Sequence, residues 1–554
     1  MRRADPEVPT LLPTRYTAPP PIVDTTSFPV VKSTDQAAGL EALLTLARPV
    51  EAAEAGGTGA RRQLRVSLPL LAILTVQATL SFRLIHIDTA FTDEALYLWA
   101  GHMEWAHVLH GTPLPPFPTF FSGSPLIYPP LGALADSIGG LAGARLLSMC
   151  FMLGVTALLW ATASRLFGKR AGCFAAALFA VLGPTVHLGS LATYDAMALF
   201  FLALSAWLAT GARERWDGTG WIAGAAAALL VANAAKYATV LFDPVVLGLA
   251  FLTAYPRPGG RLAVARLAQL TFYVVTGAIL LFSIATYGNG YYITGIEITT
   301  LTRVYGTVST SVIMHDSLVW LAAVMVPAAC ALVGVFREQA AQRRFLLLLL
   351  VGAGCLVPLE QVRIHTLTSL NKHVDFGAWF AAAAAGYAID RLLRLLRRPV
   401  LQAVGTATLA GVVAWLAQPG FAQARSIATW ANSANLITAL RPALQHTDGA
   451  VLIDVHSIAE YYLPPVGAEW YRWSSTASLI LPSGRTVNAP IGAEGRLGPY
   501  LTLMRRGYFS VVELNSSTPL TQGLTTYLSA DSRYRLLATG PYGSGVYRIW
   551  ERRQ

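Results

Sequence analysis

Acidic residues gather directly after the first long apolar segment of the chain. The stretch 88–104 contains four carboxylates and one histidine: Asp88, Asp93, Glu94, His102 and Glu104. It follows an apolar run, 66–87, that is long enough to cross a bilayer. Because carboxylates are costly to hold near hydrocarbon, such a cluster indicates function. We interpret it as a catalytic loop.

Two further ionisable residues lie at the ends of apolar segments. Asp195 begins one such segment, and Lys236 lies in the almost loopless stretch Ala232-Asn-Ala-Ala-Lys236-Tyr237 between two others. An isolated lysine beside hydrocarbon usually needs an anionic partner. Either Asp243, which is near in sequence, pairs with Lys236, or a bound phosphate does.

The histidines of the first loop suggest a metal site as an alternative. His102, His107 and His110, together with Glu104, carry suitable ligand atoms, but their spacing matches no compact zinc motif. The polar face of a helix lying on the membrane surface explains them better. We therefore predict no metal ligands and no definite cofactor, although a divalent cation at Asp93–Glu94 stays an open alternative.

The composition indicates a membrane protein. Hydrophobic residues make up 54% of the chain and charged residues only 13%, which excludes an ordinary soluble protein. The net charge of +11 comes from basic residues in short loops between apolar runs. The positive-inside rule explains this distribution, so we expect no nucleic-acid partner.

The apolar runs predict a polytopic α-helical membrane protein. Arginines before the first run place the N-terminus in the cytoplasm, and an odd number of spans places the C-terminus outside. We expect about eleven spans: 66–87, 142–164, 171–189, 195–211, 219–235, 238–254, 264–286, 317–335, 345–360, 374–390 and 399–417.

Three regions follow from this reading. Residues 1–65 are rich in Pro, Thr and Ala, and we expect a disordered cytoplasmic segment there. Residues 66–418 form the transmembrane domain, with the outer loop 88–141. Residues 419–554 carry strand signals at 450–455, 508–514 and 547–550, which predict a small extracytoplasmic α/β domain.

Ionisable residues that the positive-inside rule does not explain fall in one layer at the outer face under this topology. A transporter would more typically place some of them at mid-membrane. Taken alone, a residue such as Glu297 or Asp316 is explained as an ordinary charged residue of a solvent-exposed loop. The others are Asp88, Asp93, Glu94, Glu104, Asp195, Asp243, Glu360, Asp375, Arg83, Arg145, Lys236, Arg303, Arg363 and Lys372.

Four motifs, in this order, resemble those of the GT-C glycosyltransferases. They are Phe91-Thr-Asp93-Glu94-Ala-Leu-Tyr97, then Tyr128-Pro-Pro-Leu131 with Gly140–Ser148, then Leu191-Ala-Thr-Tyr194-Asp195, and Ala235-Lys236-Tyr237. The chain is most similar to the branch of protein O-mannosyltransferases and lipid A aminoarabinose transferases, of the actinobacterial type. The resemblance covers about residues 66–395.

This resemblance implies a GT-C-type fold and a polyprenyl-phosphate sugar donor held in membrane lipid. A hexosyl or pentosyl group would pass to a cell-envelope acceptor, which is a glycan, lipid or protein hydroxyl, outside the bacterial cytoplasmic membrane. The implied catalytic residues are Asp93, Glu94 and Asp195, where Asp93 would act as a general base or would orient the acceptor. The implied phosphate ligands are Lys236, Arg303, Arg363 and Lys372, and substrate contacts are assigned to His102, Tyr128, Tyr194, Tyr237 and His373.

Two other functions fit some of the same features. A transporter or flippase for a lipid-linked glycan would also place charges toward lipid. A non-catalytic scaffold would use residues 419–554 to bind envelope polysaccharide. The acidic first loop and the single layer of charges favour the glycosyltransferase.

Overall fold

The computed structural model describes residues 58–553 with ten internal gaps: 213–217, 256–259, 302–304, 336–339, 446, 448, 455, 464–469, 490–494 and 516–517. Arg303 and residues 1–57 therefore lie outside the described residues. The chain divides into two compact units, Met1–Leu64 and Arg65–Gln554. Helix α2 (Thr58–Phe82) begins within the segment that was expected to be disordered.

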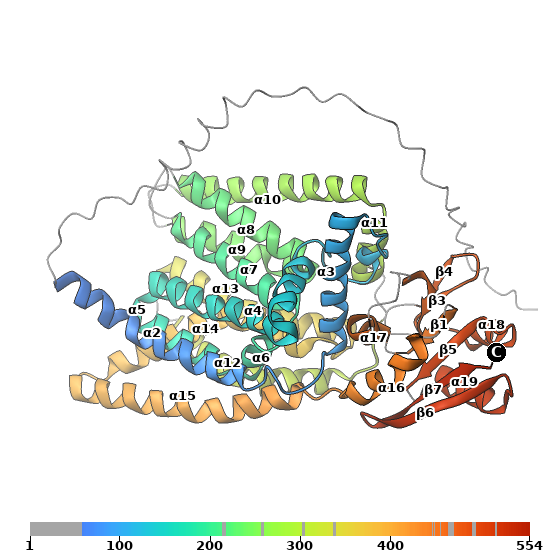
Figure 1. The fold of residues 1–554 in the computed structure, drawn as a ribbon. Helices are drawn as coiled ribbons and strands as arrows, with labels where there is room; N and C mark the ends of the chain where they lie inside the picture. Colours follow the sequence, from blue (N-terminus) through green and yellow to red (C-terminus); the bar gives the residue numbers. More distant parts are fainter. Residues whose placement is uncertain are drawn as a thin grey trace, which may run out of the picture. The chain divides into compact units, whose positions relative to one another are not determined.

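Long helices fill most of the larger unit (Figure 1). Most of them run in roughly one direction, while α3 crosses that direction in front of the others (Figure 1). After α2 the helices are α3 (Thr92–His110), α4 (Tyr128–Phe167), α5 (Lys169–Ala180), α6 (Gly183–Leu188), α7 (Tyr194–Gly211), α8 (Thr219–Ala235), α9 (Asp243–Ala254), α10 (Arg261–Gly288), α11 (Tyr291–Ile296), α12 (Thr310–Val335), α13 (Ala341–Ile364), α14 (Leu370–Leu395) and α15 (Pro399–Ile427). Short turns of helix occur at η1 (Phe117–Thr119), η2 (Tyr237–Phe242) and η3 (Glu297–Leu301).

Seven stretches of the described residues are long and apolar enough to cross a membrane: Tyr128–Phe167, Tyr194–Gly211, Tyr237–Ala254, Arg261–Gly288, Thr310–Val333, Ala341–Ile364 and Pro399–Ile427. The structure is thus that of a multi-pass membrane protein, and the count of eleven stays a prediction. The predicted span at 171–189 is divided between α5 and α6, which have 12 and 6 residues. Helix α14 is more polar, because Lys372, Asp375 and Asp390 lie on it.

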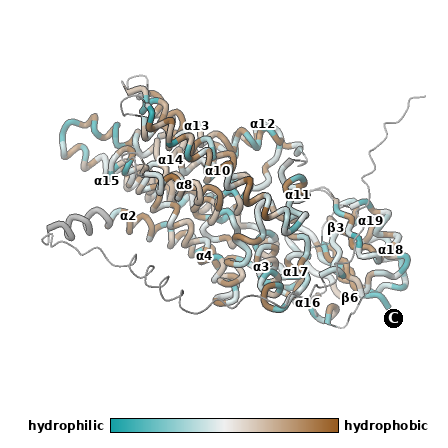
Figure 2. Tube along the Cα trace, turned by 90° about the horizontal axis from the view of Figure 1, so that it is seen from above, coloured by the Kyte–Doolittle hydropathy of each residue, from teal (hydrophilic) through white to brown (hydrophobic). Residues whose placement is uncertain are grey.

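Small residues allow α14 to pack at the centre of the helical part. The run Ala381–Ala385 is buried throughout. A Cβ atom on Gly386 would lie 2.2 Å from the carbonyl oxygen of Ala171 on α5, so no larger residue fits at that crossing. By contrast, Ile279, Phe282 and Ile284 on α10 are exposed, as expected for a face covered by lipid. Figure 2 shows hydrophobic residues spread along these helices.

The C-terminal region is a mixed α/β sheet, as predicted. Its five strands lie in the order β2-β1-β5-β7-β6, where β1 is parallel to β2 and β5, and β7 is antiparallel to β5 and β6. The bounds are β1 (Ala450–Ile453), β2 (Trp473–Ser474), β5 (Phe509–Leu514), β6 (Tyr534–Tyr542) and β7 (Gly545–Arg552), with a separate hairpin of β3 (Ser478–Ile480) and β4 (Thr486–Asn488). Helices α16 (Ala434–Gln445), α17 (His456–Tyr462), α18 (Leu497–Arg505) and α19 (Pro519–Ala530) and the turn η4 (Trp470–Arg472) complete it. The expected strands correspond to β1, β5 and β7.

The packing of α14 against α5 gives a first testable prediction. We expect Gly386→Ala to lower the melting temperature of the purified protein, because overpacking costs about 1–3 kcal/mol. Gly352→Ala on α13 is the matched control: nothing lies within 4 Å of its added Cβ, and alanine should gain about 1 kcal/mol in a helix. Equal melting temperatures for the two variants would contradict the close crossing.

Candidate active site

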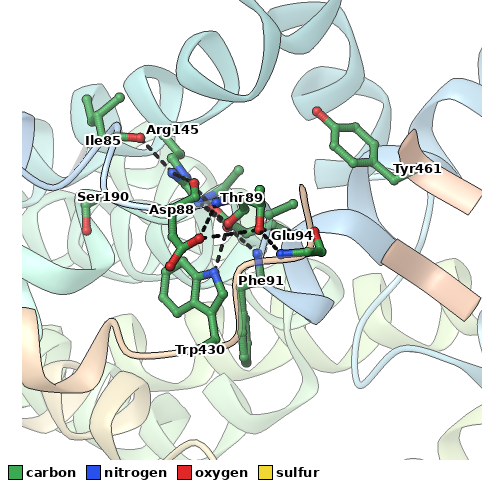
Figure 3. A network of polar contacts seen from close by, with 12 residues as sticks. Ile85, Asp88, Thr89, Phe91, Glu94, Arg145, Ser190, Trp430 and Tyr461 are labelled. Atoms are coloured by element: carbon green, nitrogen blue, oxygen red, sulfur yellow. Dashed lines mark hydrogen bonds and ion pairs between the residues drawn. The ribbon is translucent and has the colours of Figure 1, made fainter. Parts of the chain in front are cut away.

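A buried ion pair fixes the start of α3 (Figure 3). Glu94, in the first turn, is fully buried, and its carboxylate accepts two hydrogen bonds from Arg145 of α4, at 2.8 Å from Nε and 2.7 Å from Nη2. The same carboxylate accepts hydrogen bonds from the backbone N–H groups of Ala192, at 2.7 Å, and Phe91, at 2.9 Å. One side chain therefore joins α3, α4 and the segment that leads into α7.

Arg145 also holds the chain between α2 and α3. Its guanidinium donates hydrogen bonds to the carbonyl oxygens of Ile85 (2.6 Å), Asp88 (3.1 Å) and Thr89 (3.2 Å). Every oxygen of Glu94 is thus occupied twice, by a cation and by a backbone N–H group. This geometry does not support the catalytic role predicted for Glu94. It indicates a structural role, in which the carboxylate holds α3, α4 and the segment before α7 together.

Asp93 is adjacent in sequence to Glu94 but remains accessible. Its Oδ2 atom lies 2.6 Å from Nζ of Lys372, near the start of α14, and about a third (33%) of its side chain is exposed, whereas that of Lys372 is almost wholly buried. Both residues line a cavity of about 400 Å³, together with Phe91, Trp320 and Trp430. A hydroxyl group in this cavity could reach the Asp93 carboxylate. Lys372 is the cationic partner of Asp93, and its role as a phosphate ligand stays a prediction.

A second lysine–aspartate pair lies deeper. Asp195, in the first turn of α7, is fully buried, and its Oδ1 atom accepts a hydrogen bond of 2.5 Å from Nζ of Lys236. Asp243, the partner suggested by sequence proximity, instead accepts hydrogen bonds from Asn233 at 3.0 and 3.1 Å. The pairing of Lys236 with Asp243 is therefore wrong. Nε2 of His373 lies 3.9 Å from Asp195.

A larger cavity of about 530 Å³ opens beside Lys236. Its polar lining includes Lys236, Tyr237, His373, Glu360 and Arg363. Apolar side chains supply much of the rest, among them Val240, Leu241, Phe242, Val357, Ile364 and Phe376. A cavity with cations and an apolar wall suits a phosphate attached to a lipid chain. The consecutive residues Lys372 and His373 line different cavities, so the start of α14 contributes to both.

A cluster of tyrosines packs against Lys236. Tyr194 stacks on Tyr97, with ring centroids 4.5 Å apart, and Lys236 Nζ lies 4.6 Å from the centroid of the Tyr194 ring. Tyr128 is buried against the same Tyr97 ring. Burial, with Tyr194 and Asp93 nearby, holds the pKa of Tyr97 well above its usual value, so its phenol stays neutral. Tyr128 and Tyr194, which were predicted to contact substrate, line neither of the two cavities, whereas Tyr237 lines the larger one.

His102 lies apart from these residues. Its Nε2 atom is 2.7 Å from Oδ2 of Asp136 on α4, and the Tyr461 hydroxyl of α17 donates a hydrogen bond of 2.7 Å to the other oxygen of Asp136. Neither described cavity beside Asp93 or Lys236 includes His102 in its lining. The predicted substrate contact of His102 is therefore not reflected in the structure, which shows a polar link to the C-terminal region instead.

The C-terminal region contacts the segment between α2 and α3 directly. The backbone N–H of Ala90 donates a hydrogen bond of 2.8 Å to the Tyr462 hydroxyl, and Trp430 Nε1 donates one of 2.8 Å to the carbonyl oxygen of Thr89. Sequence reasoning missed Trp430, since no motif marks it. It also missed the structural role of Arg145 as the partner of Glu94, although Arg145 was among the ionisable residues assigned to the outer face.

A divalent cation does not fit at Asp93–Glu94. Both carboxylates already face a cationic side chain, Lys372 or Arg145. Within the described part of the chain, no three His, Cys, Asp or Glu side chains are grouped so that they could hold a metal ion.

Comparison with known proteins bears on these observations. Residues 133–287 match the family model described as dolichyl-phosphate-mannose-protein mannosyltransferase. This match confirms the predicted enzyme class, a membrane glycosyltransferase that uses a polyprenyl-phosphate sugar. No curated protein matches the chain in sequence.

Several solved structures have a similar fold. Crystal structures of ArnT from Cupriavidus metallidurans, apo and bound to undecaprenyl phosphate, have TM-scores of 0.57 and 0.59 and identities of 14% and 13%; both alignments cover 86% of this chain and 97% of ArnT. The apo oligosaccharyltransferase of Archaeoglobus fulgidus has a TM-score of 0.53 at 11% identity, covering 80% of this chain and 69% of that one. At these identities the likeness concerns the fold, which is the predicted GT-C type.

The different roles of Glu94 and Asp93 can be tested by measuring the stability of variants. We expect Glu94→Ala to destabilise the protein by about 3–5 kcal/mol, because it leaves Arg145 buried and unpaired. Asp93→Asn should cost less, because water reaches a third of this side chain and the asparagine amide oxygen can still accept a hydrogen bond from Lys372. Thermal unfolding of the purified variants measures both changes. Equal losses of stability would contradict the assignment of Glu94 as the structural residue of the two.

Proposed function

We propose that this glycosyltransferase moves a sugar from a polyprenyl-phosphate donor to a hydroxyl group of a cell-envelope acceptor, at the outer face of the cytoplasmic membrane. The observation that carries the proposal is the placement of two cavities around two lysine–aspartate pairs. Lys236 faces the cavity with the apolar wall, and the accessible carboxylate of Asp93 faces the other. Donor and acceptor would thus approach the ion pairs from different cavities.

The donor would occupy the larger cavity. Its single phosphodiester charge would lie at Lys236, with Tyr237 and His373 nearby, and its lipid chain along Val240 and the other apolar residues. Lys236 donates one hydrogen bond to Asp195, and an ammonium group has three N–H groups to offer. Asp195 would keep the lysine charged and oriented while the lysine binds phosphate. Arg303 remains a predicted ligand.

The reaction would be a single displacement at the anomeric carbon. The acceptor oxygen forms a bond to that carbon, the bond from carbon to the phosphate oxygen breaks, and its electron pair stays on the phosphate. The acceptor proton passes to the carboxylate of Asp93. Because the transition state resembles an oxocarbenium ion, negative charge grows on the leaving phosphate, and Lys236 stabilises that charge.

The surface of α3 supports the assignment of this site to a membrane face. Trp105, Val108 and Leu109 near its C-terminal end are exposed apolar side chains, and α3 runs across the direction of the long helices (Figure 1). A helix of this kind lies well in the headgroup region. Under the positive-inside rule, the basic residues of the short loops support the prediction that this face lies outside the cytoplasm.

Sugar transfer in isolated membranes tests the proposal. With radiolabelled polyprenyl-phosphate sugars, we expect Asp93→Asn to lower the rate by about 10²-fold or more, because a proton acceptor is lost. Lys236→Ala should lower it by about 10²–10³-fold, by analogy with the loss of one oxyanion donor.

The control variant is Asp531→Asn, which removes a carboxylate paired with Arg533 in the C-terminal region. It should leave transfer unchanged. Full transfer by both the Asp93 and the Lys236 variants would overturn the proposed roles. Passage of the lipid-linked sugar across vesicle membranes without any new glycosidic bond would support the transporter or flippase instead.

A further inference from the structure

An acidic side chain lies among the cations of the larger cavity. Glu360 precedes Arg363 by one turn on α13, and its carboxylate accepts hydrogen bonds of 2.8 Å from Nε and 2.7 Å from Nη2 of that arginine. Nη1 of Arg363 donates a further hydrogen bond of 3.4 Å to the Tyr305 hydroxyl. All three side chains line the cavity. The flat fork of the arginine is therefore already occupied by a carboxylate of the chain itself.

This pair differs from the pair of Lys236 and Asp195 in its exposure. The Arg363 and Glu360 side chains are 60% and 37% exposed, whereas those of Lys236 and Asp195 are 4% and 0% exposed. An exposed ion pair contributes little to stability, so an incoming anion can replace the carboxylate. Arg363 can thus exchange Glu360 for a phosphate without any change in the fold.

The reaction changes the charge of the lipid that occupies this cavity. The donor is a phosphodiester with one negative charge, whereas the product is a phosphate monoester with a charge of about −1.5 to −2 at pH 7. Attraction to Lys236 and Arg363 rises with that charge. Cations alone would therefore bind the product more tightly than the donor and slow its release.

We propose that Glu360 sets the preference of this cavity for the phosphodiester donor over the phosphomonoester product. It does so by competing with the bound phosphate for Arg363 and by repelling the more highly charged ligand more strongly. Glu360 is a specificity-determining residue that favours release of the spent lipid. This inference rests on the function proposed above.

Ligand binding to the full-length protein tests it. The probes are undecaprenyl phosphate, a monoester, and undecaprenyl methyl phosphate, a diester that cannot transfer a sugar. In Glu360→Gln the amide keeps the shape of the side chain and one acceptor for Arg363. We expect the Kd of the monoester to fall about fivefold and that of the diester only about two- to threefold, since the loss of repulsion scales with ligand charge.

Two further variants identify the cause. Arg363→Met should weaken binding of the monoester more than binding of the diester. In the Arg363→Met background, Glu360→Gln should increase the affinity for the monoester by a smaller factor than in the wild type. The matched control is Glu551→Gln: Glu551 pairs with Arg535 on the sheet at 3.0 Å, with side-chain exposures of 61% for the arginine and 34% for the glutamate, close to those of the cavity pair. It should change neither Kd.

Weaker binding of both probes by Glu360→Gln would overturn the inference, because Glu360 would then merely position Arg363. An equal gain for both probes would also overturn it. If the wild-type protein binds neither probe, or if Lys236→Ala leaves both Kd values unchanged, the proposed donor site itself is wrong and the inference falls with it. The two failures are thus distinguishable.

Discussion

The need to pair carboxylates next to a membrane governs this site. Glu94, Asp93 and Asp195 each meet a cationic side chain, and the partners Arg145, Lys372 and Lys236 are 51, 279 and 41 residues away in sequence. An unpaired buried charge is strongly destabilising. The three pairs join α3 to α4, α3 to α14, and the start of α7 to the end of α8, and Glu94 also holds the segment before α7 through the N–H of Ala192.

Accessibility separates the roles of these similar pairs. Glu94 is enclosed by two backbone N–H groups and a guanidinium and has no oxygen left for substrate. Asp195 is buried and holds Lys236. Asp93 alone among the three keeps part of its carboxylate open, and it faces the smaller cavity. A carboxylate thus has a structural role at Glu94, orients a lysine at Asp195 and is the proposed proton acceptor at Asp93, according to its surroundings.

Sequence reasoning reached the elements of the fold more easily than the pairing of its charges. Apolar runs predicted the long helices, and the strand signals at 450–455, 508–514 and 547–550 predicted β1, β5 and β7, because local patterns determine both. The partner of Lys236 was open between Asp243 and a phosphate, yet the lysine pairs with Asp195, since tertiary packing brings the start of α7 beside the end of α8. The pairing of Lys372 with Asp93 spans 279 residues, and no local pattern carries it. The break between α5 and α6 was also missed, as both halves are apolar.

The position of a lipid phosphate is the most direct test of this account. An experimental structure of the protein with undecaprenyl phosphate would show which cavity holds it. The account predicts the phosphate in the larger cavity, within hydrogen-bond distance of Nζ of Lys236, with the lipid chain along the apolar wall near Val240 and Phe242. A phosphate bound instead beside Lys372 and Asp93 in the smaller cavity would contradict the assignment of donor and acceptor sides.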